Sequence, residues 1–571
     1  MAETLISPGV LARETDNSFL RKQPVNVGAA IIGPTVKGPV ENPQIVTSYN
    51  EYQNKFGTKF TSGSDTYTYF TSITAYNYFN NGGKSLLVAR VASGSFTEAS
   101  SSFVSGSTSA SVASGSAFVL ETLGEGIMFN SSGSEDSSGS LISGSSSNFR
   151  WQIVNSDTAS GTFAVLIRQG NDNTNTPIIL ETWTNLSLDP LSTNFISKVI
   201  GDQKENYNST NNQMDVSGSF PNNSQFVRVK KVNNLTPNYF DNNGVAKAEF
   251  TAYIPINTSG SFGGASGNIM GEAQFFENIT DGNKSQGIPS ASYDNMINLL
   301  SNKDDYQFNV LLTPGLFNTL QTSEVTSIIT NTQQRGDNIY VVDLVPFGST
   351  VTTVSNNATT RDTSYAAAYW PWVQVIDPDS GKNVWVPAST VVGGVYANND
   401  VQGETWTAPA GINRGGLQTV LRPEQKLNQT NRDTLYSKKV NPIASFPGTG
   451  IVVYGQKTLQ TKASALDRVN VRRLLISLKS FITQVGQTLV FDGNTNGTRN
   501  QFLNTVNPYM ENVQQRDGLY AFKVIMDSSN NTGDVIDRNQ MIGQIFVQPT
   551  KTAEFIYLDF NISPTGTTFP A

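Results

Sequence analysis

The sequence predicts a mixed α/β (α+β) protein of several domains, with a β-rich insertion and an extended arm at each end. The chain has 571 residues, which is more than a single hydrophobic core usually serves. Short apolar runs bounded by Gly and Pro alternate with amphipathic stretches, as is typical of strands and helices that share one core. After residue 92 the composition changes abruptly to Ser, Gly and Asn, which predicts a separate module.

The first segment, residues 1–24, is predicted to be an extended arm. It opens with a short apolar patch that includes Ile6, Val10 and Leu11. Pro8-Gly9 interrupts any regular element at this point, and the segment then becomes polar.

Residues 25–92 and 291–400 are predicted to form one middle α/β domain that is interrupted by the insertion. The earlier part holds strand-length apolar runs, an aromatic helix around 67–79 and a buried strand over 85–91. The later part resumes the same pattern with a strand–helix–strand unit, whose helix spans 323–335. Its strands are apolar throughout, as expected for a sheet covered on both faces.

Residues 93–290 are predicted to be an outer, mostly β insertion of one or two modules. Ser and Gly dominate 93–148, and this is also the composition of a flexible linker. Apolar islands such as "AFVLETL", and the later runs "FRWQIV" and "TFAVLIRQG", favour folded strands with long loops over a disordered linker.

Residues 401–550 are predicted to form a C-terminal domain, and 551–571 a C-terminal arm. The domain is expected to contain two helices, over 466–489 and 499–515. The strands "AFKVIMD" and "MIGQIFVQP" follow them.

The composition excludes several kinds of enzyme. The chain has no Cys and no His, which removes disulfides, thiolate nucleophiles, Ser–His pairs and zinc sites with Cys or His ligands. A net charge of −7 gives no general attraction to nucleic acid or anionic lipid. No cationic, apolar leader opens the chain and no apolar run is long enough to cross a bilayer, so a cytoplasmic origin is expected.

Three short motifs suggest chemistry that their surroundings do not support. Gly83-Lys84-Ser85 resembles the end of a phosphate-binding loop, but Tyr78 stands where that motif requires Gly. Asp377 to Lys382 lacks the remaining ligands of a calcium loop and is better explained as a hairpin turn. The "RGD" at 335–337 is better explained as a helix end capped by Gly. The sequence therefore predicts no enzyme activity, no cofactor and no metal site.

The most strongly patterned stretch is "LDRVNVRRLLISLKSFITQVG", residues 466–486. Asp467 is predicted to be its N-cap, and the apolar residues fall on one helical face. A basic stripe beside that face admits three explanations: a solvated surface, a nucleic-acid contact or a surface for a partner protein. Arg468, Arg472 and Lys479 form this stripe, and Arg473 begins the opposite polar edge of the helix.

The end of the chain, "AEFIYLDFNIS", has the period-two pattern of a β-strand. Such a strand is commonly the edge strand of its own domain. Because both termini look like short strands on extended arms, exchange of strands between identical subunits is the alternative. The strand includes Phe555, Ile556, Tyr557, Leu558 and Phe560.

Several stretches match a known family in order along the chain. They include "SPGV", "GAAIIGPTVKGPVENPQIVTSYNEYQNKFG" and "ETWTNLSLDPLSTNFISKVI" and, most closely, "SYAAAYWPWVQV", "LYSKKVNPIASFPGTGIVVYGQKTL", "LDRVNVRRLLISLKSFI" and "NTGDVIDRNQMIGQIFVQPTKTAEFIYLDF". Through these stretches the chain resembles the contractile tail sheath proteins of myovirus-type tailed bacteriophages. The resemblance covers Ser7 to about Phe560 and is weakest in the Ser/Gly-rich insertion.

The resemblance implies a structural virion protein that polymerises into stacked six-membered rings around the tail tube. Contraction of this polymer would drive the tube through the host envelope. The resemblance also implies that 401–550 lie innermost, that the basic stripe faces the tube and that the insertion points outward. The two arms would join neighbouring subunits.

The expected partners are other copies of the chain, the tail tube protein, and the baseplate and tail terminator proteins. Direct contact with nucleic acid and insertion into a membrane are not expected. The protein is expected in the virion tail, and in the host cytoplasm during assembly. Two alternatives remain open: the sheath of a phage-like contractile injection system, and a carbohydrate-binding virion protein.

Overall fold

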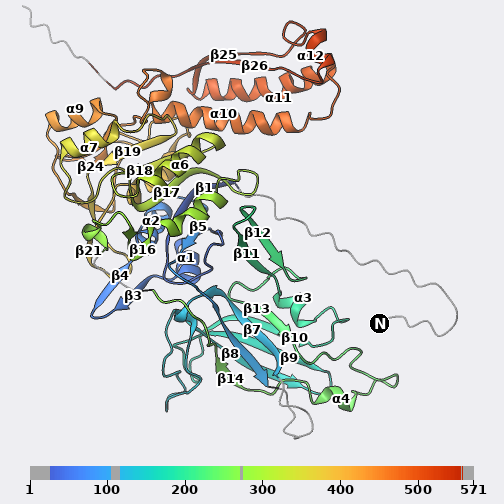
Figure 1. Cartoon of the computed structure of the whole chain (residues 1–571). Coiled ribbons are helices and arrows are strands. Elements are labelled where there is room, and N and C mark those ends of the chain that lie inside the picture. The colour runs from blue at the N-terminus through green and yellow to red at the C-terminus, as the bar shows by residue number, and fades with distance from the viewer. Residues whose placement is uncertain (1–25, 105–115, 270–273, 555, 557–571) are drawn as a thin grey trace, which may run out of the picture.

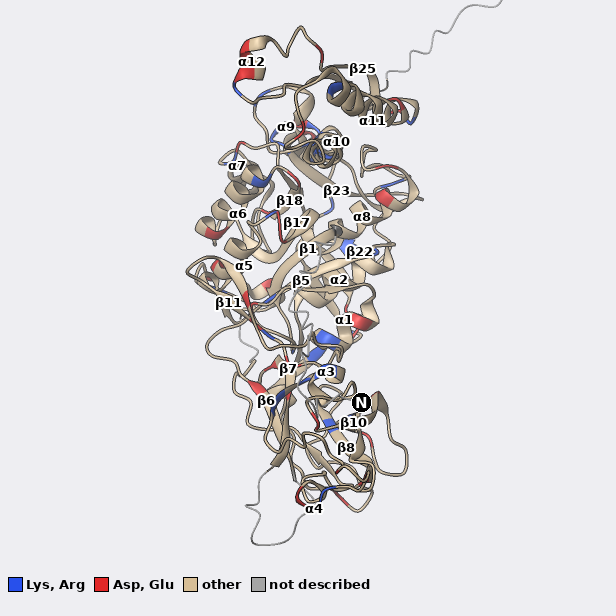
Figure 2. Ribbon diagram, turned by 90° about the vertical axis from the view of Figure 1, so that its right-hand side faces the viewer, with Lys and Arg blue, Asp and Glu red and all other residues tan. Residues whose placement is uncertain are grey.

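The computed structural model describes residues 26–104, 116–269, 274–554 and 556. The described molecule is elongated and has three parts in line (Figure 1). A β-rich part lies at one end, a large α/β domain in the middle, and two long helices with a small sheet at the other end. The side view in Figure 2 shows the same order.

The middle domain is built on an eight-stranded sheet. Its inner strands run parallel, and the outermost strands β2 and β24 run antiparallel to their neighbours. β1 lies between β5 and β17, so segments on both sides of the insertion share one sheet. In sheet order the strands are β2 (Gln44–Val46), β5 (Leu86–Val91), β1 (Asn26–Pro34), β17 (Gln307–Phe317), β18 (Ile339–Asp343), β19 (Ala366–Trp370), β23 (Val440–Phe446) and β24 (Gly450–Val453).

Helices cover both faces of this sheet, which explains why its strands read as continuous apolar runs. Successive strand residues, such as Ile31 and Ile32, alternate between two separate core clusters. α2 and α8 approach so closely that a Cβ on Gly394 would lie 2.7 Å from the backbone oxygen of Asn77. One face is covered by α1 (Tyr49–Phe56), α2 (Phe70–Asn80) and α8 (Ser389–Gln402), and the other by α5 (Asp294–Leu299), α6 (Thr322–Arg335), α7 (Val351–Ala358) and α9 (Gln429–Ser437).

A smaller three-stranded sheet extends the middle domain. β20 and β21 form the hairpin predicted around Asp377 to Lys382, so that prediction is confirmed. The Asp379 carboxylate in its turn accepts hydrogen bonds from the Tyr49 hydroxyl at 2.8 Å and the Gln53 amide at 3.0 Å. The turn therefore fixes the hairpin against α1. The strands are β20 (Val373–Ile376), β21 (Asn383–Val386) and β22 (Val420–Pro423), and a separate hairpin is formed by β3 (Lys59–Ser62) and β4 (Asp65–Thr68).

The insertion is a β sandwich. Its two sheets, in the orders β10-β9-β8-β14 and β13-β7-β6, bury one shared core that includes Phe118, Trp151 and Val165. A further hairpin folds back from the insertion and packs Tyr207 and Met214 against the middle domain. The strands are β6 (Glu98–Val104), β7 (Ser116–Glu125), β8 (Phe149–Asp157), β9 (Thr162–Gln169), β10 (Ile179–Ser187), β11 (Lys204–Asn208), β12 (Gln213–Ser217), β13 (Val227–Val232) and β14 (Ser259–Ser261), with short helices α3 (Ile196–Ile200) and α4 (Ala248–Thr251).

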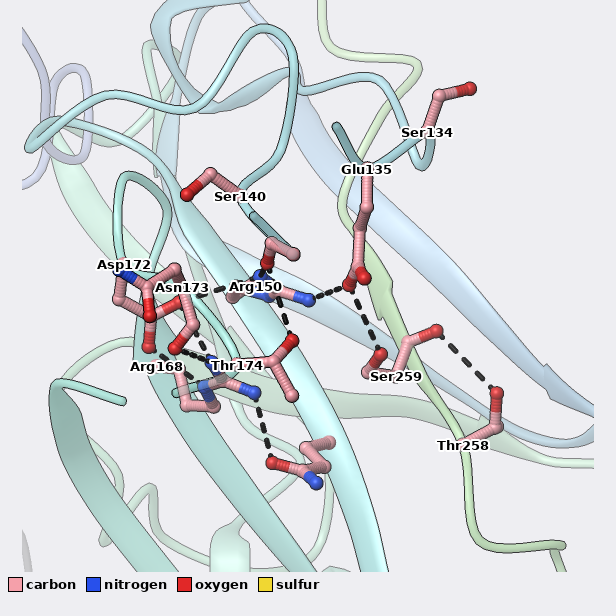
Figure 3. Close-up of polar contacts among 12 residues, drawn as sticks. Ser134, Glu135, Ser140, Arg150, Arg168, Asp172, Asn173, Thr174, Thr258 and Ser259 are labelled. Atoms are coloured by element: carbon pink, nitrogen blue, oxygen red, sulfur yellow. Dashed lines mark hydrogen bonds and ion pairs between the residues drawn. The ribbon is translucent and has the colours of Figure 1, made fainter. Parts of the chain in front are cut away.

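Ion pairs of two buried arginines tie loops of the insertion to this sandwich (Figure 3). Arg150 on β8 lies opposite Arg168 on β9, and Asp172 bonds to both, at 3.5 Å and 2.7 Å respectively. Glu135, from the Ser/Gly-rich stretch, completes the cluster through an ion pair with Arg150. Because breaking a buried pair leaves an uncompensated charge, these contacts favour one loop conformation. The flexible-linker alternative is therefore wrong for the described part of this stretch.

The C-terminal domain is a helical hairpin with a two-stranded sheet packed against it (Figure 1). Its helices and strands share one core cluster, in which Leu474, Phe502 and Met510 are buried. The helix predicted over 499–515 is thus present and begins slightly earlier. The elements are α10 (Val469–Gln487), α11 (Asn496–Gln515), β25 (Leu519–Ile525), α12 (Gly533–Asp537) and β26 (Gln544–Pro549).

The boundary between the middle and C-terminal domains lies near residue 460 rather than at the predicted position after residue 400. β23 pairs in parallel with β19, with Val440 opposite Ala368, and β24 pairs with β23. These strands therefore belong to the middle sheet. Pairing between segments so distant in the chain leaves no local pattern in the sequence, so the sequence alone predicts too early a boundary.

The other short motifs have structural roles within the described ranges. α6 ends at Arg335, and Gly336 follows with a left-handed φ of 70°. Arg335 is buried and pairs with Asp337 at 2.7 Å, which confirms the helix-end explanation of the Arg-Gly-Asp stretch.

No helix in the described ranges is both long and apolar enough to span a bilayer. The same ranges hold no group of three or more acidic residues that could bind a metal ion.

Asp343 gives the middle domain a testable pH dependence. Its buried carboxylate accepts hydrogen bonds from the backbone N–H of Ser389 at 3.1 Å and from the Ser389 hydroxyl at 2.5 Å. Burial raises the pKa of Asp343 from 3.8 to about 7. The folded state therefore binds the proton of the Asp343 carboxyl more tightly than the unfolded chain does. The stability that this protonated group contributes is complete below pH 3.8 and is lost as the pH rises through about 7.

We therefore expect Asp343→Asn to remove part of the pH dependence of unfolding. Between pH 5 and pH 8 the original chain should lose on the order of 3 kcal/mol of its free energy of unfolding through Asp343. The variant should not show this loss. Urea unfolding at the two pH values measures this difference. Asp433→Asn, at an exposed position on α9, is the control and should leave the profile unchanged. Parallel pH profiles for Asp343→Asn and the original chain would contradict the assignment.

Candidate inter-subunit interface

The β25–β26 sheet has one face on the helices and one face open. Phe522 and Val524 on β25 pack into the domain core, as do Ile545 and Val547 on β26. The alternate residues point away from the core, because strand side chains alternate between faces. Among these is Phe546, which lies opposite Lys523 and is 55% exposed.

Both outer edges of this sheet are unpaired within the described residues. There, β25 and β26 pair with each other and no third strand joins either of them. The free N–H and C=O groups of an edge strand are a template for another strand. The exposed rings of Tyr520 and Phe546 lie on these two strands. An added strand would therefore find both backbone partners and apolar contacts.

After β26 the chain crosses to the boundary between the C-terminal and middle domains, where Glu554 is held. Its carboxylate accepts hydrogen bonds from Arg468 Nε at 2.6 Å, from Arg468 Nη2 at 2.9 Å and from the Tyr436 hydroxyl at 2.8 Å. The Gln456 amide donates a longer one at 3.3 Å. We call this group of Glu554, Arg468, Tyr436 and Gln456 the Glu554 clamp.

The Glu554 clamp favours the ionised carboxylate. Burial by itself favours the protonated acid, but the hydrogen bonds from Arg468 and Tyr436 outweigh it and lower the pKa of Glu554. The clamp therefore contributes its stability at pH values above the usual range of a glutamate and loses it in acid. It fixes the path of the chain directly before the predicted C-terminal arm.

Most of the predicted arm residues lie outside the described residues. Ile556 is described, and its side chain is 76% exposed. The predicted terminal strand and the predicted N-terminal arm therefore stay predictions. The residues outside the described ranges are Ile6, Val10, Leu11, Phe555, Tyr557, Leu558 and Phe560.

The predicted basic stripe on α10 is not one exposed surface. Arg472 and Arg473 are buried, with exposed fractions of 4% and 3%. Arg473 pairs with Asp400 on α8 at 2.6 Å and lies over the Tyr396 ring, and Arg472 stacks on the Tyr365 ring at 4.0 Å. Burial alone would lower the pKa of Arg473, but Asp400 outweighs it and raises that pKa. The prediction that these two residues line an open surface is wrong, because this side of α10 packs against the middle domain.

Arg468 and Lys479 differ from these two residues and from each other. Arg468 belongs to the Glu554 clamp and directly precedes α10. Asp467 does not cap the helix as predicted, and instead pairs with Arg468 at 2.9 Å.

Lys479 is exposed on the second half of α10. Beyond it, the turn between α10 and α11 exposes Val490 and Phe491, at 58% and 102%. The surface available to a partner is thus this distal half of the hairpin.

Sequence reasoning missed the Glu554 clamp and the Arg473–Asp400 pair. Arg468 and Glu554 are 86 residues apart, and Arg473 and Asp400 are 73 residues apart. No short motif can reveal contacts over such separations. The open face of the sheet does have a signal, since "AFKVI" and "QIFVQP" both alternate apolar residues with exposed positions.

Comparisons with known proteins place the two C-terminal parts of the chain in one family. Residues 290–459 match the family model of the phage tail sheath protein central domain. Residues 461–563 match the model of the phage tail sheath C-terminal domain. The division between the two matches coincides with the domain boundary near residue 460 that the eight-stranded sheet defines.

Three curated tail sheath proteins are similar to this chain. The one from Vibrio phage KVP40 is 38% identical over 207 residues, which are 36% of this chain and 31% of that protein. The one from Enterobacteria phage T4 is 33% identical over 229 residues, 40% of this chain and 35% of that protein. The one from Salmonella phage ViI is 29% identical over 337 residues, 52% of this chain and 53% of that protein. The matched regions thus span about a third to a half of these relatives' lengths.

A solved structure extends the likeness of fold to nearly the whole chain. The crystal structure of a sheath tail protein from Listeria innocua aligns with a TM-score of 0.54 and 10% identity, covering 93% of this chain and 96% of that one. At this identity the likeness concerns the fold alone. Residues 290–459 and 461–563 thus match the central and C-terminal domains of the phage tail sheath protein family, in that order along the chain.

Proposed function

We propose that this chain is the structural subunit of a contractile tail sheath, which polymerises into a helical stack of rings around a tail tube. The observation that carries the proposal is the β25–β26 sheet, whose outer edges are unpaired within the described residues. A strand donated by a neighbouring copy would join subunits through backbone hydrogen bonds. The role is structural and involves no catalytic step.

Contraction, in this proposal, is a cooperative change between two packings of the same subunits. The faces of the domains slide and repack, while the donated strands keep neighbouring subunits connected. Such a polymer does work because the contracted packing has the more favourable contacts. Driving a tube through the host envelope requires no nucleotide, in agreement with a sequence that carries no complete phosphate-binding loop.

The elongated shape supports one orientation of the subunit in this polymer. The β sandwich and the C-terminal domain lie at opposite ends of the described molecule (Figure 1). We place the C-terminal domain innermost, with the distal half of the α10–α11 hairpin on the tube, and the sandwich outermost. Lys479 would then face acidic groups of the tube. The baseplate and tail terminator proteins would contact the ends of the polymer in the virion tail.

The arms offer the first test, by electron microscopy of the purified full chain. We expect rings or hollow tubes, and we expect a chain that stops after Ile556 to stay folded and fail to form tubes. This truncation retains the Glu554 clamp and removes most of the proposed donor strand together with the residues that follow it. Ordered tubes from the truncated chain would contradict strand donation by this arm.

A matched pair of variants separates strand pairing from chain length. Leu558→Ser with Phe560→Ser removes apolar side chains from one face of the predicted strand. Each such side chain is worth about 1.5–3 kcal/mol when buried, so the concentration needed for assembly should rise by roughly a hundredfold or more. Asp559→Ser with Asn561→Ser alters the other face and should change it little. Equal effects of the two pairs would show that this strand has no buried face in the polymer.

The second test separates the buried and exposed parts of α10. Arg473→Gln leaves Asp400 without its partner, and we expect it to lower the free energy of unfolding of the subunit by about 3–5 kcal/mol. Lys479→Glu should change that free energy by less than about 0.5 kcal/mol, as most surface substitutions do, and should weaken co-assembly with tube protein. Urea unfolding and co-sedimentation with tube protein measure the two effects.

The control for charge is Lys462→Glu, an equal change of charge at an exposed position outside α10. It should leave both unfolding and co-assembly unchanged. If Lys479→Glu and Lys462→Glu co-assemble equally well with tube protein, the distal half of the hairpin does not face the tube.

A further inference from the structure

The Glu554 clamp lies between the last described strand and the chain end that the proposed function treats as a donated arm. β26 ends at Pro549, and five residues later the clamp holds Glu554. In between, Thr552 accepts a further hydrogen bond from the Gln456 amide at 2.6 Å. Any pull on the chain beyond Glu554 therefore reaches the clamp before it reaches β26.

The position of the clamp matters because β26 is weakly placed to resist a pull. Within the described residues it is bonded along one edge only, to β25. Only its bonds to β25 can resist a pull, and a pull across the strand would open them one after another. Loss of β26 would also destroy one edge of the sheet proposed to accept donated strands.

The groups that hold Glu554 are tied to the middle domain instead. Gln456 accepts a backbone hydrogen bond from Val469, the first residue of α10, at 2.8 Å. The backbone N–H of the neighbouring Lys457 donates to the side-chain oxygen of Asn441 on β23 at 2.6 Å, and the Asn441 amide donates to the Lys457 carbonyl at 2.8 Å. Its ammonium lies 4.1 Å from the centre of the Tyr436 ring. The clamp thus leads into the eight-stranded sheet and the start of α10.

The bonding of the clamp suits it to resist a pull. The Arg468–Glu554 contact is bidentate and charge-assisted, which is the strong class of side-chain hydrogen bond. The two side chains are only 24% and 17% exposed, so solvent screens the contact less than it screens a surface ion pair. For comparison, the Asp534–Arg538 pair in the same domain joins side chains that are 70% and 66% exposed.

We infer that the Glu554 clamp is a mechanical anchor of the C-terminal arm, which transfers tension from a neighbouring subunit to the middle domain and so protects β26 from being peeled off β25. The inference rests on the proposed function for the origin of the tension. Glu554 and Arg468 are positioning residues in this role, because neither need contact the neighbouring subunit.

The test is to pull single molecules of the full-length chain. Because the chain contains no cysteine, Lys303→Cys in an exposed loop of the middle domain and Ala571→Cys at the chain end provide the only attachment points. In this background we expect Glu554→Gln to raise the rate of the first opening event under constant force by roughly tenfold or more, because the charge-assisted bonds are lost. Asp534→Asn removes a carboxylate of the same domain outside the path of the pull, and should open at the unchanged rate.

Hydrogen exchange of the unloaded monomers distinguishes an anchor from a merely structural contact. The ladder with β25 and the domain core hold β26 when no force acts, so we expect its amides to exchange within about threefold of the original rate in Glu554→Gln. Unprotected β26 amides in the unloaded variant would overturn the inference, since the clamp would then be needed for folding. Equal opening rates for Glu554→Gln and Asp534→Asn under force would overturn it as well. Neither measurement requires a polymer. Failure of the chain to form tubes would therefore count against the proposed function, while the opening rates and the hydrogen exchange would still test the anchor.

Discussion

The structure depends on one constraint: the β25–β26 sheet must keep a fixed shape although, among the described residues, no strand pairs with its outer edges. An isolated two-stranded sheet is only marginally stable in water. Here the α10–α11 hairpin supplies the missing support, because the inner face of the sheet buries residues such as Phe522 and Val547 against Leu474 and Phe502. The strands are short and Lys523 projects from the open face, which limits pairing with unrelated strands. The edges are therefore available to a matching strand without being generally adhesive.

α10 makes this sheet part of a larger rigid unit. Leu474 and Leu478 belong to the core of the C-terminal domain, whereas Val469 and Ile476 belong to a core cluster of the middle domain. The Arg473–Asp400 pair closes the junction between the two cores. One helix thus takes part in two cores, so the small sheet cannot turn independently of the eight-stranded sheet. The burial of Arg472 and Arg473 follows from this double role, and only the distal half of the helix is left for a partner.

The parts of the fold that sequence could predict are those set by local periodicity. Helix α10, the Asp377 hairpin and the Gly336 helix end all depend on residues within a few positions of one another. The failures share a different cause. A basic stripe on a helix reads as exposed unless its partners are known, and Asp400 lies in another helix and another domain. In the Ser/Gly-rich stretch the apolar islands did favour folded strands, but the contact of Glu135 with Arg150 on β8 is again one between distant residues. Composition cannot show such pairings.

The two chain ends differ in how the fold can receive a pull, and this difference supports the anchor that we infer for the C-terminal one. The segment before Asn26 continues into β1, which lies inside the eight-stranded sheet between β5 and β17. A pull along β1 loads the hydrogen bonds on both of its edges together. The segment after Glu554 follows β26, which is bonded along one edge within the described residues, so fewer hydrogen bonds can share the same pull. By holding Glu554 next to residues bonded to β23, the clamp directs both pulls into the same sheet. In the proposed polymer, tension would then pass from one arm to the other through the eight-stranded sheet, whose two faces are both buried.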